Sequence, residues 1–181
     1  ARRCQREGIR VVVGGVHASV RAQDFAGCAD YIFCGEAEDN VAQFLADLRV
    51  GRPSGLYRTT DRPKLEHCPV PLYRLAKKYP YQSIPVQLSR GCPHQCTFCL
   101  SSALYGTRVR RKTLQQVQGE FEAIFSVWKK PFLFFTDDNF LLNEPYSRAV
   151  LELLEGRADW YAFTDVSVAA KPELMDFLTQ H

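Results

Sequence analysis

The 181-residue sequence has no long hydrophobic run, hardly any excess charge of either sign and a single methionine. No apolar stretch approaches the roughly 18 residues that cross a bilayer, which excludes a spanning helix. The sequence has 23 Lys and Arg residues and 20 Asp and Glu residues, so its net charge is only +3. A charge this small gives no evidence for nucleic-acid binding. The charged residues 1–6 are not followed by the apolar segment of a secretory signal.

The sequence also lacks an initiator methionine and opens and closes inside secondary-structure patterns, so we expect a fragment of a longer chain. It lacks the even, dispersed cysteine set of a secreted disulfide-rich protein as well. Its seven cysteines include three that are tightly clustered, which favours reduced thiols and a cytoplasmic location. The cysteines stand at positions 4, 28, 34, 68, 92, 96 and 99.

Residues 1–51 have the pattern of part of an α/β layer. Two short runs, 9–13 and 31–33, are rich in β-branched or aromatic residues, and glycine follows each, as expected for buried parallel strands that end in sharp turns. A short helix is expected between them, over 19–27. Apolar residues at helical spacing predict an amphipathic helix over 40–50, which Gly51 ends.

Residues 52–85 lack helical periodicity and hold six of the ten prolines. Such a composition is typical of a connection between two domains, either a free linker or a segment that lies along a surface. The six prolines are at positions 53, 63, 69, 71, 80 and 85.

The strand–helix alternation resumes over residues 86–181. Expected strands cover 86–88, 132–135 and 160–163, and Thr113 with Gln116 forms a capping box ahead of a long helix. Two further helices are expected, one from Asn143 to Leu154 and one that begins near Pro172 and ends near Thr179. Repeated units of this kind predict a parallel sheet with right-handed crossovers. Three units cannot close a barrel, so the sheet keeps an open edge.

Cys92, Cys96 and Cys99 have the spacing CxxxCxxC just after a predicted strand. Three thiolates on one loop can bind one metal centre. A structural zinc site needs a fourth ligand, which His94 or Cys68 could supply. An iron–sulfur cluster held by three cysteines instead leaves one iron open to a substrate or cofactor.

The stretch from Arg90 to Cys99 resembles the signature of the radical S-adenosylmethionine enzymes. The resemblance implies that Cys92, Cys96 and Cys99 bind a 4Fe-4S cluster, whose open iron binds S-adenosylmethionine and whose electron cleaves it to a 5′-deoxyadenosyl radical. Phe98 matches the aromatic residue that commonly stands before the last cysteine in this family. The resemblance implies that the backbone of Phe98 lies near the adenine of S-adenosylmethionine. The implied scaffold is a full or partial TIM-like barrel.

Asp137, Asp138 and Asn139 directly follow the apolar strand 132–135. In a parallel sheet they share a rim with the cysteine loop, where the acids could accept hydrogen bonds from the ammonium group of S-adenosylmethionine. The alternative is that they cap the following turn. The stretch resembles the equivalent element of radical enzymes with an appended cobalamin-binding domain.

Gly14 and Gly15 follow the first strand, and Gly35 and Glu36 follow the second. Together with the cysteine motif, they resemble the C-terminal part of a Rossmann-like cobalamin-binding domain. The resemblance implies that Gly14 and Gly15 lie near the corrin or its nucleotide tail and that Glu36 closes the loop above the ring. The usual Gly-Glu-Gly-Glu pattern is broken by Ala37. His17 fits a packing role better than cobalt ligation.

A run of basic residues precedes the capped helix. We expect these side chains to be exposed to solvent, and the less favoured alternative is that they contact an anion. The members of the run are Arg108, Arg110, Arg111 and Lys112.

These observations predict an α/β chain in three parts. Residues 1–51 form the end of a cobalamin-binding domain, 52–85 a linker, and 86–181 the first units of a radical S-adenosylmethionine barrel. The expected function is methylation or rearrangement of an unactivated carbon in a small molecule, with cobalamin and a reducing partner such as flavodoxin or ferredoxin. Two alternatives stay open, a radical enzyme without cobalamin and a non-catalytic zinc-binding module. The fragment alone is expected to be inactive if the barrel stays incomplete.

Overall fold

A computed structural model describes residues 1–59 and 61–181. The chain forms two compact units, the first comprising residues 1–63 and 98–106 and the second residues 64–97 and 107–181. No helix in the described part of the chain is both long and apolar enough to cross a membrane. Each unit is built around a three-stranded parallel sheet, as the strand–helix alternation predicted.

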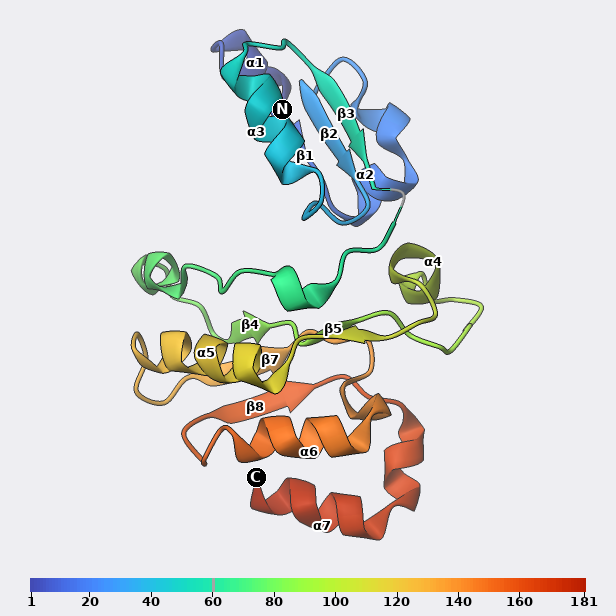
Figure 1. Cartoon of the computed structure of the whole chain (residues 1–181), viewed down its shortest axis with the longest axis vertical. Coiled ribbons are helices and arrows are strands. Elements are labelled where there is room, and N and C mark those ends of the chain that lie inside the picture. Colours follow the sequence, from blue (N-terminus) through green and yellow to red (C-terminus); the bar gives the residue numbers. More distant parts are fainter. Residues whose placement is uncertain (60) are drawn as a thin grey trace. The chain divides into compact units, whose positions relative to one another are not determined.

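The first unit has the strand order β1-β2-β3 (Figure 1). Phe44 of α3 packs its ring edge-on against the stacked rings of Phe33 and Tyr57, and this cluster forms the core on one face of the sheet. The elements are α1 (Arg2–Arg6), β1 (Val12–Val13), α2 (Val16–Val20), the 3-10 helix η1 (Ala22–Phe25), β2 (Tyr31–Cys34), α3 (Val41–Arg49), β3 (Gly55–Arg58) and α4 (Ser101–Tyr105).

The second unit has the strand order β4-β7-β8 (Figure 1). It also has a separate antiparallel pair, β5-β6. Its core includes buried side chains from the strands and from α5 and α6. The elements are η2 (Leu65–His67), η3 (Tyr73–Lys78), β4 (Ile84–Val86), β5 (Ser89–Arg90), β6 (Arg110–Arg111), α5 (Leu114–Phe125), β7 (Phe132–Phe135), η4 (Phe140–Leu142), α6 (Glu144–Glu152), β8 (Asp159–Ala162), η5 (Val166–Ala170) and α7 (Pro172–Gln180).

The local helix signals are confirmed. Thr113 and Gln116 form the reciprocal capping box at the start of α5, and the Asn143 side chain accepts a hydrogen bond from the Tyr146 N–H at the start of α6. Pro172 is the first residue of α7. These signals are reliable because a cap satisfies backbone groups within a few residues of itself.

Parts of the predicted linker, residues 52–85, are regular structure. Residues 55–58 form β3, which pairs in parallel with β2, and residues 84–85 already belong to β4. Pro85 is compatible with a strand because β4 lies at the edge of its sheet, where a missing N–H leaves no ladder bond unmade. Between these strands, Gln116 of α5 donates hydrogen bonds to the carbonyl oxygens of Leu65 and Glu66, so this segment follows the surface of the second unit.

Three further elements differ from the expected pattern. The first strand is only Val12–Val13, the helix expected over 19–27 is divided into α2 and η1, and the strand expected at 86–88 ends at Val86. On α3, Phe44 packs inward but Leu45 stays 42% exposed. Periodicity indicates which residues share a helix face, but it does not supply a neighbouring element to bury that face.

Candidate functional site

The carboxyl ends of β4, β7 and β8 lie at one edge of the second unit's sheet, since all three strands are parallel. The cysteine motif follows β4, Asp137 and Asp138 follow β7, and Asp165 follows β8. This is the edge at which α/β proteins usually place their functional residues.

Asp137 is 2% exposed and directed into the protein. Its Oδ2 accepts a hydrogen bond from the Leu88 N–H at 3.1 Å, and its Oδ1 accepts one from the Ser89 hydroxyl at 2.5 Å. Both oxygens of this carboxylate thus bind the segment after β4, and the cofactor contact predicted for it stays a prediction. Asp138 is half-buried at the same edge and stays a candidate for that contact.

Burial raises the pKa of Asp137 to about 6, although the bonds from Ser89 and Leu88 oppose the shift. The ordinary pKa of the carboxyl is 3.8, so between roughly pH 4 and 6 the folded protein binds the proton more tightly than the unfolded chain does. This group's contribution to stability consequently falls as the pH rises through that interval.

Asn139 belongs to a small polar network between the ends of β7 and β8. Its amide donates to Asp165 Oδ2 at 2.6 Å and accepts from the Thr164 hydroxyl at 3.0 Å. Hydrogen bonds from Ser167 and Asn139 lower the pKa of Asp165 to about 2. His94 Nε2 of the cysteine loop lies 3.8 Å from Asp165. Thr164 and Asp165 were not predicted as site residues. Their hydrogen bonds to Asn139 form only because β8 lies beside β7, which the local sequence does not show.

The cysteine loop, residues 91–100, contains neither helix nor strand. The thiol of Cys92 is buried, whereas Cys96 and Cys99 are exposed. Across residues 1–59 and 61–181, no three His, Cys, Asp or Glu side chains are grouped closely enough to bind a metal ion. The motif fits a cluster in donor type and number, because three thiols on an irregular loop can close around it. Phe98 is 89% exposed on the same loop.

The basic run is not a uniformly solvated face. Arg110 and Arg111 form β6, which pairs with β5 just ahead of the cysteine motif. Lys112 is largely buried, and its Nζ lies 2.6 Å from Glu120 Oε2. The prediction of a solvated side chain is thus wrong for Lys112, because the sequence does not reveal the buried acid eight residues further on.

In the first unit, Ser19 joins the two glycine turns. Its hydroxyl donates to the Gly15 carbonyl oxygen and accepts from the Gly35 N–H, both at 2.8 Å. Gly15 and Gly35 have φ angles of 88° and 86°, which glycine adopts without strain. Gly14 packs against strand β2, where a Cβ would lie 3.5 Å from Phe33 Cβ. His17 bonds to Asp24 and packs against Phe25, consistent with the packing role.

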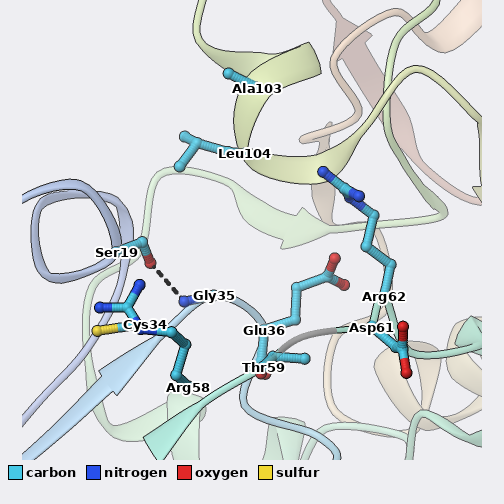
Figure 2. A pocket seen from close by; sticks show the side chains of 10 residues that line it. All are labelled: Ser19, Cys34, Gly35, Glu36, Arg58, Thr59, Asp61, Arg62, Ala103 and Leu104. Atoms are coloured by element: carbon cyan, nitrogen blue, oxygen red, sulfur yellow. Dashed lines mark hydrogen bonds between the residues drawn. The ribbon is translucent and has the colours of Figure 1, made fainter. Parts of the chain in front are cut away.

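A cavity of about 230 Å³ lies beside these turns. Figure 2 shows the Glu36 side chain extending into it, with Arg58 and Arg62 along its wall. The Thr59 hydroxyl donates to the Glu36 carbonyl oxygen and accepts from the Asn40 amide, which fixes the turn that carries Glu36. The cavity is lined by Ser19, Cys34, Gly35, Glu36, Arg58, Thr59, Asp61, Arg62, Ala103 and Leu104.

The fold is that of the corresponding part of a cobalamin-dependent radical S-adenosylmethionine enzyme. It superimposes on the radical enzyme OxsB, solved with aqua-cobalamin bound, with a TM-score of 0.63 at 17% identity over 86% of this chain and 26% of OxsB. The resemblance predicted from the cysteine and glycine motifs is confirmed. No protein-family model matches the chain.

The chain is related in sequence to named methylases. It is 31% identical to the hopanoid C-2 methylase of Rhodopseudomonas palustris over 99% of this chain and 36% of that protein. It is 27% identical to the bacteriochlorophyllide d C-12(1)-methyltransferase of Chlorobaculum tepidum over 96% of this chain and 40% of that protein. The chain thus spans between a third and two fifths of the length of these relatives.

Proposed function

We propose that this chain is part of a cobalamin-dependent radical S-adenosylmethionine methyltransferase that acts on an unactivated carbon of a small molecule. The observation that carries the proposal is the CxxxCxxC loop that follows β4, a strand of a parallel sheet, with only the short strand β5 between them. Its support is the relationship to a methylase over 99% of the chain.

In this proposal Cys92, Cys96 and Cys99 bind a 4Fe-4S cluster, which supplies the electron that cleaves S-adenosylmethionine. Asp138 accepts hydrogen bonds from the ammonium group of that cofactor, and the backbone at Phe98 lies beside its adenine. Asp138 suits this role because it is half-buried at the edge where the loop begins, and a carboxylate is an acceptor for ammonium.

The cobalamin would lie at the glycine turns of the first unit. Gly14 and Gly15 let a flat ligand approach the backbone closely, because they carry no side chain. Glu36 extends into the adjacent cavity, and Ser19 and Thr59 hold the two turns in place. A reducing partner such as flavodoxin or ferredoxin and a reducing cytoplasm complete the proposal.

Anaerobic reconstitution with iron and sulfide, followed by titration with hydroxocobalamin, tests the proposal. We expect one 4Fe-4S cluster per chain, detected by iron analysis and by brown charge-transfer absorbance, and one bound cobalamin. Tight zinc binding without that absorbance would identify a zinc module instead. A cluster without cobalamin binding would favour a radical enzyme of other chemistry.

The cobalamin site can be tested separately with Gly35→Ala. An alanine there would have a φ angle of 86°, and its Cβ would lie 3.3 Å from Thr59 Cβ, so the turn beside the cavity must shift. We expect cobalamin to bind about tenfold more weakly, as measured by the absorbance titration, which corresponds to roughly 1.4 kcal/mol.

Gly27→Ala is the matched control. Gly27 also has a positive φ angle, 74°, but a Cβ there meets nothing within 4 Å, and the residue does not line the cavity. Both variants carry backbone strain of about 1–2 kcal/mol, so only an effect on the cavity distinguishes them. Equal cobalamin affinity in the two variants would contradict the assignment of this site.

A further inference from the structure

The base of the cysteine loop is held by a buried carboxylate. Asp137, at the end of β7, bonds to both Leu88 and Ser89, and Ser89 stands three residues before Cys92. Asp137 is 49 residues from Leu88 along the chain, so these bonds connect two strand ends that only the fold brings together.

A second set of contacts fixes the same segment. Ser89 and Arg90 of β5 pair with Arg110 and Arg111 of β6, and the Lys112 N–H donates to the Leu88 carbonyl oxygen at 2.9 Å. The segment 91–109, which contains the three motif cysteines and α4, therefore leaves from, and returns to, one short ladder. Asp137 bonds to the Leu88–Ser89 end of that ladder, and the cysteine motif follows its opposite end, after Arg90.

A carboxylate suits this position better than its neutral analogue does. The Leu88 N–H donates to one oxygen of Asp137 and the Ser89 hydroxyl donates to the other. An ionised carboxylate can accept a hydrogen bond at both oxygens. Asparagine would direct an NH2 group at one of those donors. Its introduction would break one bond and leave a buried donor unpaired, which costs more than the bond itself contributes.

We propose that Asp137 is a positioning residue for the cluster, holding Leu88 and Ser89 so that Cys92 is directed toward the other two cysteines. The inference rests on the proposed function, since it concerns the same cluster. It is distinct from the predicted cofactor contact, because here Asp137 acts through the segment ahead of the loop. Groups that orient metal ligands typically change metal affinity 10- to 100-fold when they are removed.

The test compares Asp137→Asn and Ser89→Ala with the unchanged protein after anaerobic reconstitution. We expect cluster affinity, measured by competition with an iron chelator, to fall about tenfold or more in Asp137→Asn and less in Ser89→Ala. The electron paramagnetic resonance spectrum of the residual reduced cluster should also change, a readout that a general loss of stability does not move.

Ser147→Ala is the matched control. The Ser147 hydroxyl is buried and bonds to the carbonyl oxygens of Phe140 and Asn143, so this variant also loses buried hydrogen bonds, but none of them reaches the cysteine loop. It should load the cluster normally with an unchanged spectrum. If Asp137→Asn binds the cluster with the affinity and spectrum of the unchanged protein, the positioning role is refuted. If the unchanged protein binds no cluster, the proposed function itself fails.

Discussion

Replacing Cys96 by alanine is expected to abolish binding of the iron–sulfur cluster. The motif supplies three thiolates, and a 4Fe-4S cluster with only two protein ligands has two irons without a protein ligand. Cys96 is exposed, so its removal takes little from the core and the fold should persist. Iron and sulfide analysis after anaerobic reconstitution, with the absorbance of the cluster, measures the outcome.

The control for this experiment is Cys4→Ala. Cys4 is exposed like Cys96 but belongs to α1 of the first unit, outside the motif. It should leave iron binding unchanged, while Cys96→Ala reduces it to background. Full cluster loading in Cys96→Ala would show that the ligand set is wrong and would remove the main support for the proposed function.

Replacing Glu120 by alanine is expected to destabilise the second unit strongly. Glu120 is 2% exposed, and its Oε1 accepts a hydrogen bond from the Tyr73 hydroxyl at 2.5 Å while its Oε2 lies 2.6 Å from Lys112 Nζ. Removing the acid leaves the largely buried Lys112 ammonium without its partner. Breaking one side of such a buried pair typically costs 3–5 kcal/mol, here about 4 kcal/mol of unfolding free energy.

Chemical denaturation of the cluster-free protein measures this loss. Glu122→Ala, an exposed position on the same helix, should change the unfolding free energy by less than about 0.5 kcal/mol. The double variant Lys112→Met with Glu120→Leu should recover much of the loss, because it removes both charges together. A small effect of Glu120→Ala alone would mean that water reaches Lys112 and that the pair is not truly buried.

The Glu120 contacts also explain how the proline-rich segment is anchored. Burial and the neighbouring Glu120 raise the pKa of Tyr73, so its hydroxyl stays protonated and continues to donate over the physiological range. The Tyr73 ring also packs edge-on against Trp128, which lies three residues after the end of α5. A segment that composition alone describes as a linker is thus held against α5 by a buried aromatic residue and the bonds from Gln116.

The glycine turns and the buried acids illustrate where prediction from the sequence stops. Gly15 and Glu36 were predicted as parts of one site from the resemblance to a cobalamin-binding domain, but Ser19, which bonds to the turns at Gly15 and Gly35, was not. Asp137 and Asp138 are adjacent and identical in type, yet one is buried against Ser89 and the other is half-buried. Alternation along a strand separates such neighbours only when the packing of both faces is known.

The sequence by itself determined the α/β class, the helix caps at Thr113 and Asn143, and the motif of three cysteines, because periodicity, capping and ligand spacing are properties of nearby residues. Only the tertiary structure decided that residues 55–58 join a sheet, that Lys112 is buried with Glu120, and that Asp137 bonds to Leu88 and Ser89. Each of these depends on partners that are distant in the chain or hidden in a core, where burial and hydrogen bonding set the free energy.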